Sequence, residues 1–254
     1  MTILSENRFF RPLVGPTIAT IVALAILVGL GTWQIERLHW KLGLIANITH
    51  RMAAPPSAPP AEDTWAKLDL NALEYHHLKL QGHFLNKDEL YYFTQNDDGE
   101  PGFDIITPFV LDSGAIVLVD RGYVPQANKL PDTRAEGQIE GETTLTGVAR
   151  APQTRGYFSA PDDIAKNMWF TRDPATMGAA LKLSRVAPFY VEADATPNVG
   201  GLPIGGRTQV HIRNEHLQYA ITWYGLALVL FVIYLVYHWN NGRIGRRPSE
   251  TKES

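Results

Sequence analysis

The chain has 254 residues, a formal net charge of −3 and no cysteine. The lack of cysteine excludes disulfides, thiolate metal sites and a cysteine nucleophile. The slight acidity and the lack of a long basic stripe argue against nucleic-acid binding. Charged residues are missing from two stretches, residues 12–35 and 216–242, if histidine is counted as neutral. Between these stretches lie about 180 residues of ordinary charge density, which is enough to bury a sizeable core.

The first predicted element is a transmembrane helix over residues 13–33, which follows a short N-terminal segment of residues 1–12. A helix needs roughly 20 apolar residues to cross the hydrocarbon core, and this run is long enough. A cleaved signal peptide is one alternative, but its apolar run is typically only ~7–15 residues long. A buried core helix is the other alternative, and the length of the two apolar runs weakens it.

Residues 34–60 are predicted to form a helical extension and then a linker. Trp33, Arg37 and Trp40 recur at spacings of four and three, which places them on one helical face. The sequence AAPPSAPP (residues 53–60) ends the helix and has the composition of a polyproline linker.

In residues 61–213 the hydrophobic period changes to two, and we predict a β-rich extracytoplasmic domain there. Leu78, Leu80 and Phe84 alternate with polar residues, as on a half-buried strand. Further strands are predicted at 89–95, 103–110, 115–119, 143–148, 188–192 and 209–212, with a hairpin turn at 112–114. A short helix is predicted over 175–183, with Asp173 as its cap and Pro174 suited to its first position. Together they predict a small antiparallel sheet or barrel.

A second transmembrane helix is predicted over residues 214–239, with aromatic side chains near both ends, as is typical of membrane–water interfaces. Residues 240–254 form a basic tail. Because two spans put both termini on one side, the basic tail predicts that both are cytoplasmic. Glu6 makes the N-terminus a poor mitochondrial presequence, so we expect a bacterial inner membrane with a periplasmic domain.

Four small residues predict that the two spans pack as a pair. They are Gly29, Gly31, Ala220 and Gly225. Small side chains let transmembrane helices approach each other closely.

The sequence contains no GxSxG, P-loop or HExxH motif, so we expect that the chain is not an enzyme. His76, His77 and His83 form a loose group, but a metal site needs more ligands, and solvent-facing strand histidines are the favoured interpretation. Arg121 follows the most apolar predicted strand. It is either a cation for a partner or propionate, or, as we favour, part of an internal ion pair with Asp120 or another acid.

His216 opens the second span, and helical spacing places it on one face with Tyr219, Ala220 and Trp223. A neutral imidazole can ligate haem iron, and aromatic rings can pack against the macrocycle. The alternative is an interfacial histidine that hydrogen-bonds to the domain or to lipid, and spacing alone favours this alternative.

Three segments resemble the Surfeit locus protein 1 family in the same order along the chain. They are Gly31–Gln34 with Arg37, Trp40 and Lys41; Val119–Pro125; and Asn214 to Gly225. Glu215 and Tyr123 stand where that family more often has Asn and Trp. The resemblance covers nearly the whole chain and implies a membrane protein in which two transmembrane helices flank a mainly β domain.

The resemblance also implies a role in assembly of haem–copper cytochrome c oxidase, at maturation of, or haem a insertion into, the catalytic subunit. The implied haem iron ligand is His216, with Tyr219, Trp223, Trp33 and Arg37 as further cofactor-binding candidates. The expected partners are the oxidase catalytic subunit, haem a synthase and membrane lipid. A cofactor-free scaffold for an oxidase intermediate remains the alternative, and a membrane-tethered enzyme or sensor is a third.

Overall fold

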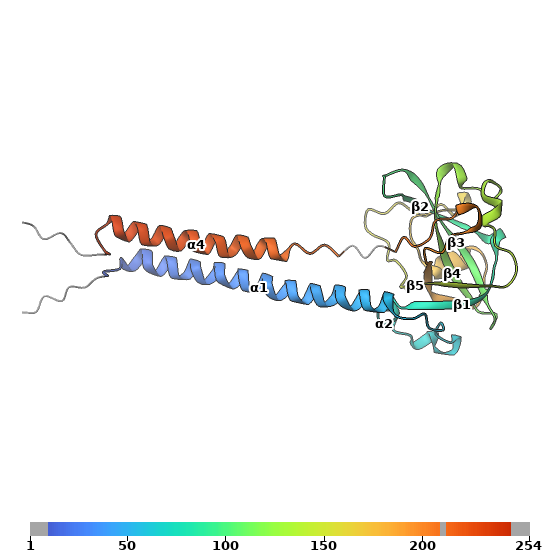
Figure 1. The fold of residues 1–254 in the computed structure, drawn as a ribbon, viewed down its shortest axis with the longest axis horizontal. Helices are drawn as coiled ribbons and strands as arrows, with labels where there is room; N and C mark the ends of the chain where they lie inside the picture. The colour runs from blue at the N-terminus through green and yellow to red at the C-terminus, as the bar shows by residue number, and fades with distance from the viewer. Residues whose placement is uncertain (1–9, 209–211, 245–254) are drawn as a thin grey trace, which may run out of the picture. The chain divides into compact units, whose positions relative to one another are not determined.

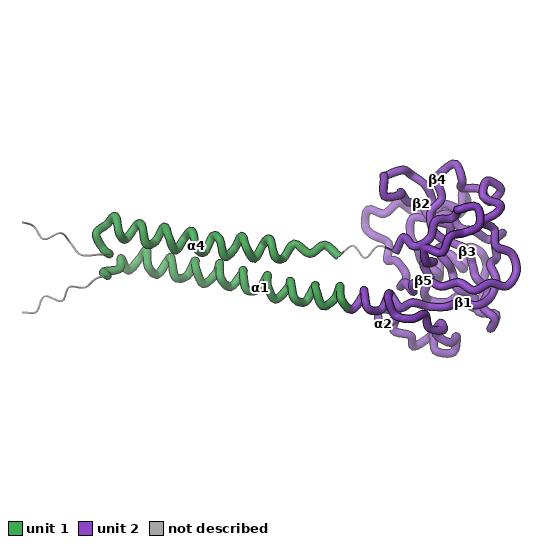
Figure 2. The backbone as a smooth tube through the Cα atoms, in the orientation of Figure 1, with its two compact units in different colours: residues 1–46, 211–254 green, residues 47–210 purple. Residues whose placement is uncertain are grey.

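The computed structural model describes residues 10–208 and 212–244. The chain divides into two compact units (Figure 2). One comprises residues 1–46 and 211–254 and is called the helix pair below. The other comprises residues 47–210 and is called the barrel domain.

Two long helices carry the predicted spans: α1 (Val14–Ala53) and α4 (His216–Asn240). Both are long and apolar enough to cross a membrane, and few of their residues are buried within the protein. Lipid, rather than a protein core, is therefore the environment that suits their side chains. α1 continues without a break from the first span into the predicted extension and ends at Ala53, where the proline-rich segment begins. The prediction of two transmembrane helices that flank a β-rich domain is confirmed.

The two helices pack together at small residues, but at only some of those predicted. Gly31 is buried, and a Cβ atom there would lie 2.9 Å from the Tyr224 ring. Ala220 is also buried. In contrast, a Cβ atom at Gly29 or Gly225 would meet nothing within 4 Å. The prediction that Gly29 and Gly225 lie in the contact is wrong, because both point away from the other helix.

The barrel domain contains seven strands among the described residues (Figure 1). They are β1 (His77–Phe84), β2 (Leu90–Gln95), β3 (Pro101–Leu111), β4 (Ile116–Pro125), β5 (Thr143–Arg150), β6 (Met168–Trp169) and β7 (Val186–Ala193). The sheet order is β1-β5-β7-β4-β3-β2-β6. An additional β1–β3 pairing closes the first five strands of this order, β1-β5-β7-β4-β3, into a barrel. Closure removes the exposed edges that an open sheet would present.

β3 closes the barrel because its two halves pair with different strands. Residues 109–111 pair with β1, whereas residues 101–106 pair with β2. β2 and β6 thus extend the sheet beyond the barrel. The expected barrel is confirmed, but the β4–β7 and β2–β6 pairings are parallel, which the expectation of an antiparallel sheet did not include.

β4 is the central strand, and both of its faces are buried. Val117 and Val119 face the main core inside the barrel, whereas Leu118 faces a second core on the other side of the sheet. The main core comprises Leu78, Leu80, Phe84, Phe109, Val117, Val119, Ala149, Ala187, Phe189 and Val191. A strand buried on both faces is expected to read as a continuous apolar run, as Val117–Val119 does.

Two short helices complete the domain: α2 (Leu70–Leu73) and α3 (Pro174–Ala180). The Asp173 side chain accepts hydrogen bonds from the N–H groups of Ala175 and Thr176, and Pro174 occupies the first helical position, as predicted. Short 3-10 helices span Glu62–Lys67, Asn86–Asp88, Gln126–Asn128, Pro131–Gly137, Ile164–Lys166 and Val199–Gly201. Residues 209–211 of the strand predicted at 209–212 lie outside the described residues, and residue 212 is not in a strand.

Candidate functional site

His216, the first residue of α4, is held by a residue of α1. Its Nδ1 atom lies 2.6 Å from Oε1 of Gln34. Because an amide oxygen only accepts hydrogen bonds, Nδ1 carries the proton and donates a hydrogen bond to Gln34. The ring is half-buried, and its Nε2 atom forms no hydrogen bond with any residue in 10–208 or 212–244. The imidazole therefore has a fixed tautomer and a free Nε2 lone pair.

His216 lies on one face of α4 with Tyr219, Ala220 and Trp223, as helical spacing predicts. Ala220 is buried against α1, Trp223 is half-buried, and Tyr219 is 51% exposed. Tyr224, one residue further on, places its hydroxyl group 3.0 Å from Oγ1 of Thr32. These contacts hold the His216 end of the two helices together.

The other predicted site residues form an aromatic and cationic stripe on α1. The Arg37 guanidinium lies 5.9 Å from the ring centroid of Trp33 and 5.1 Å from that of Trp40. Both rings are about half-exposed. At about 100° per residue, Arg37 lies only about 60° around the helix from Gln34, whereas Trp33 lies about 100° from it. Arg37 forms no ion pair with the part of the chain that the structure describes. It is therefore an exposed cation beside the His216–Gln34 pair.

The residues at this end have the chemistry that a histidine ligand of a haem iron would need. Histidines that ligate metals almost always donate their second ring N–H to an oxygen acceptor, which fixes the tautomer and the ring orientation. Nδ1 of His216 makes such a bond to Gln34. Arg213, three residues before His216, forms an ion pair with Glu215 at 2.7 Å. Arg37 is thus the better candidate cation. Gln34 was not predicted as a site residue, although it belongs to the Gly31–Gln34 segment of the family resemblance.

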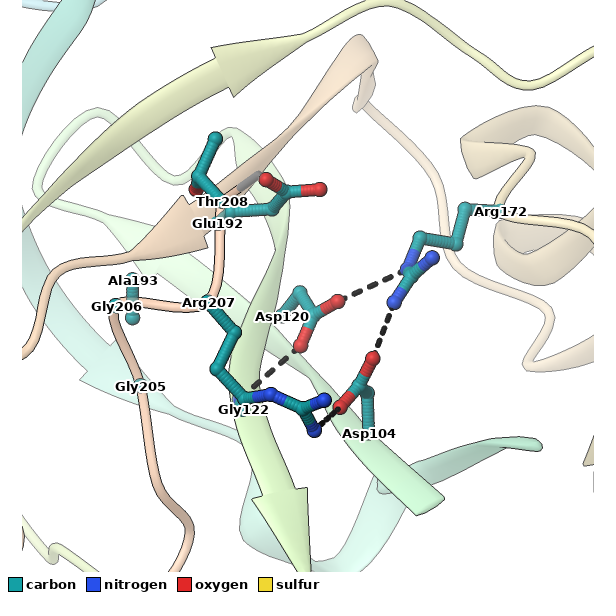
Figure 3. Close-up of a pocket in the computed structure, with 10 residues that line it drawn as sticks. All are labelled: Asp104, Asp120, Gly122, Arg172, Glu192, Ala193, Gly205, Gly206, Arg207 and Thr208. Carbon is teal, nitrogen blue, oxygen red and sulfur yellow. Dashed lines mark hydrogen bonds and ion pairs between the residues drawn. The ribbon is translucent and has the colours of Figure 1, made fainter. Parts of the chain in front are cut away.

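The barrel domain contains a separate group of buried charges (Figure 3). The Arg172 guanidinium bridges two carboxylates: its Nε atom lies 2.9 Å from Asp120, and its Nη2 atom donates to Asp104. Arg207 approaches the other oxygen of Asp104 at 3.5 Å. Asp120 also accepts a hydrogen bond from the N–H group of Gly122 at 3.0 Å. These bonds tie β3 and β4 to the segment that precedes α3.

Burial shifts the pKa values of this group. Burial and the neighbouring Asp104 carboxylate raise the pKa of Asp120 to about 7. Burial also raises the pKa of Asp104, against the effect of Arg172. For Arg172, burial acts to lower the pKa, but Asp120 and Asp104 together raise it above its usual value. Removing Arg172 would leave two buried carboxylates without their shared partner, which is strongly destabilising.

A small polar cavity of about 30 Å³ lies beside these residues, between β4, β7 and residues 205–208. Oδ1 of Asp104 and Nη1 of Arg207 have no hydrogen-bond partner there. A cavity of this size holds about two water molecules, which would satisfy both atoms. The cavity has room for water but not for an organic molecule, and the charge group around it joins β3, β4 and residues 205–208.

Arg121 forms an internal ion pair, as the favoured interpretation predicted, but its partner is Glu89 rather than Asp120. Asp120 and Arg121 are neighbours on a strand, so they point to opposite faces. Nη1 of Arg121 lies 3.8 Å from Glu89, and Arg134 binds the same carboxylate with an Nη1–Oε1 distance of 3.0 Å. Burial, together with the nearby Arg134 charge, outweighs Glu89 and lowers the pKa of Arg121 to about 10. The motif residues Asp120 and Arg121 thus anchor two different buried clusters.

His76, just before β1, and the β1 residues His77 and His83 are not gathered around one point. His77 lies 2.6 Å from a carboxylate oxygen of Asp194 through its Nε2 atom. His76 contacts the carbonyl oxygen of Leu73, and His83 lies 3.3 Å from Glu142. Within residues 10–208 and 212–244, no group of three His, Asp or Glu side chains is placed to hold a metal ion. The three histidines serve separate local contacts.

Comparison with known proteins relates the chain to one family. The SURF1 family model matches residues 21–228. Surfeit locus protein 1 of Takifugu rubripes is 39% identical over 215 residues, which cover 78% of this chain and 87% of that protein. The Homo sapiens protein of the same name is 38% identical over 215 residues, covering 78% and 69% respectively. A SURF1-like protein of Drosophila melanogaster is 36% identical over 218 residues, again covering 78% and 69%. The matched region contains the barrel domain, Gln34 and His216.

Proposed function

Because the chain belongs to the SURF1 family, we propose that it is an assembly factor for haem–copper cytochrome c oxidase. Its role is to assist maturation of the oxidase catalytic subunit rather than to catalyse a reaction. The proposed partners are that subunit, haem a synthase as the source of the cofactor, and the surrounding lipid. Two spans joined to a closed barrel suit such a membrane-bound role.

We further propose that the helix pair binds haem a transiently at His216, and the His216–Gln34 hydrogen bond is the observation that carries this proposal. Gln34 holds the proton on Nδ1, which leaves the Nε2 lone pair available for iron. The haem itself would supply the iron and the macrocycle that are to be delivered to the oxidase.

The remaining residues would orient the macrocycle. Trp223 and Tyr219 provide aromatic surface on the His216 face of α4. Arg37 would hold a propionate by a charge-assisted hydrogen bond, which is stronger than a bond between neutral groups. The Trp33 ring, whose centroid lies 5.9 Å from the Arg37 guanidinium, would add aromatic surface beside this contact. Their exposure suits a cofactor that must later leave for a partner.

The proposed location is the bacterial inner membrane, with both termini in the cytoplasm and the barrel domain in the periplasm. The basic tail after α4 supports this orientation, since positively charged segments favour the cytoplasmic side.

An absorption spectrum tests the haem proposal. The full chain is coexpressed with the enzymes of haem a synthesis, purified in mild detergent and scanned for haem a. The wild type should retain haem, and His216→Ala should lose most of it, because no described side chain replaces the axial nitrogen. Gln34→Leu should retain less haem than the wild type, since loss of a metal ligand's hydrogen-bonding partner typically costs ~10–100-fold in affinity.

His39→Ala is the matched control, because His39 is an exposed histidine on α1. It should retain haem at the wild-type level. Equal loss in His39→Ala and His216→Ala would overturn the ligand assignment. His211, whose strand position was predicted, lies outside the described residues and is the less suitable control. If the wild type never carries haem but its deletion still impairs oxidase activity, the cofactor-free scaffold is the better proposal.

A further inference from the structure

At the opposite end of the helix pair, His238 joins the two helices. The side chain is fully buried, and its Nε2 atom accepts a hydrogen bond of 3.1 Å from the N–H group of Leu13. Its Nδ1 atom lies 3.0 Å from the carbonyl oxygen of Tyr234, to which it donates. Both ring nitrogens therefore form hydrogen bonds with uncharged backbone groups, and these bonds fix the imidazole in one tautomer. The bond to Leu13 satisfies one of the free N–H groups at the start of α1.

Beside this junction the two helices form an apolar groove of about 530 Å³. Its lining consists of Phe10, Thr17, Thr20, Ile21, Leu24, Phe231, Tyr234, Leu235 and Ile244. The Thr17 and Tyr234 hydroxyl groups lie 2.9 Å apart and hydrogen-bond to each other, so they offer little to a polar ligand. The volume is in the range of pockets that bind small molecules, ~300–1,000 Å³. The groove is thus shaped for a hydrocarbon chain.

Two arginines lie side by side where the groove ends. The N–H group of Arg11 donates a 2.9 Å hydrogen bond to the carbonyl oxygen of Arg243, and an antiparallel bridge pairs Phe10 with Ile244. Both arginine side chains are exposed, and neither forms an ion pair with the described residues. Backbone pairing thus brings together two cations without an acidic partner from the described chain. Such a pair repels itself unless an anion lies between the two charges.

We propose that this end of the helix pair is a binding site for an anionic phospholipid. One acyl chain fills the groove, and the lipid phosphate binds Arg11 and Arg243. The occupant is a lipid because the groove lies between two membrane-spanning helices and is lined mainly by apolar side chains, with the Thr17 and Tyr234 hydroxyl groups bonded to each other. It is anionic because a zwitterionic headgroup adds an ammonium group that the two arginines repel, whereas the headgroup of an anionic lipid carries only the negative phosphate. Basic pockets between transmembrane helices are known to bind such headgroups.

This inference is independent of the proposed role in oxidase assembly. Most of the lining, including Phe10, Thr17 and residues 231–244, lies outside residues 21–228, which the family model matches. The site is therefore assigned from this chain's own residues.

Thermal unfolding of the full chain in mild detergent tests the proposal. The midpoint is measured after addition of phosphatidylglycerol or phosphatidylcholine with the same acyl chains. Phosphatidylglycerol should raise the midpoint more, and the double variant Arg11→Gln with Arg243→Gln should remove the difference. At ~1 kcal/mol for each basic residue, its apparent affinity for phosphatidylglycerol should fall about 30-fold. The variant should unfold normally without lipid, since both side chains are exposed.

Two further variants separate the headgroup from the chain. Arg11→Lys with Arg243→Lys keeps both charges and should retain the preference for phosphatidylglycerol. Ile21→Trp fills part of the groove and should weaken the effects of both lipids. Equal effects of the two lipids on the wild type, or an unchanged preference in the glutamine variant, would overturn the proposal and leave only ordinary boundary lipid around the helices.

Discussion

Adding a methyl group at Gly31 should weaken the packing of α1 against α4. A Cβ atom there would lie 2.9 Å from Cζ of Tyr224, whereas carbon atoms in contact prefer ~3.5–4.0 Å. The ring must therefore retreat by roughly 0.6–1 Å. Its hydroxyl group is hydrogen-bonded to Thr32 at 3.0 Å, so the retreat also weakens that bond. Because overpacking costs ~1–3 kcal/mol and the partly exposed Tyr224 ring can shift, we expect Gly31→Ala to be less stable than Gly225→Ala by about 1–2 kcal/mol.

The assay is thermal or denaturant unfolding of the full chain in detergent, with Gly225→Ala as the matched control. Both changes replace a glycine within a helix, but a Cβ atom at Gly225 meets nothing within 4 Å. The difference between the two variants therefore isolates the contact with Tyr224. In a Tyr224→Phe background the ring is released from Thr32, so Gly31→Ala should cost less than in the wild type. Equal stability of Gly31→Ala and Gly225→Ala would refute the reasoning.

Two other predictions concern the barrel domain and the topology. The pKa of Asp120 is raised by burial from 3.8 to about 7, so the folded chain binds this proton more tightly than the unfolded chain. Its contribution to the unfolding free energy should fall as pH rises from about 4 to about 7, by at most about 4 kcal/mol, and then level off. Asp120→Asn should flatten this slope in urea unfolding at pH 5, 6, 7 and 8, and an unchanged slope would contradict the assignment. A phosphatase that is active only in the periplasm should be active when fused at Ser57 and inactive when fused at Ser254, and activity at Ser254 would reverse the proposed topology.

The sequence predicted the elements of this fold well where one local pattern decides them. Charge-free runs of sufficient length predicted α1 and α4, and the alternation of Leu78, Leu80 and Phe84 predicted β1. Asp173 and Pro174 predicted the start of α3 because capping depends only on neighbouring residues. In each case the interaction that determines the structure lies within a few positions along the chain.

Helix packing was predicted only in part, because residue size does not reveal the direction in which a residue points. Gly31 and Gly29 are both small, but they are two residues apart and lie about 200° from each other around α1. Only Gly31 meets Tyr224. The hydrogen bond between Gln34 and His216 was not predicted for the same reason. The two residues are 182 positions apart, and whether they meet depends on how α1 and α4 are rotated about their axes.

The buried charges of the barrel depend on contacts that no local pattern contains. Asp120 and Arg121 are adjacent, and sequence alone suggests that they could pair with each other. A strand turns neighbouring side chains to opposite faces, so each must find a partner from elsewhere. Asp120 binds Arg172, 52 positions away, and Arg121 binds Glu89 on the other face. An unpaired buried charge costs several kcal/mol, so the folded barrel must place a partner beside each of these two residues. Asp120 and Arg121 thus bind partners on the two faces of β4, and this is how the motif stabilises the barrel. The proposed cofactor chemistry lies in the helix pair instead.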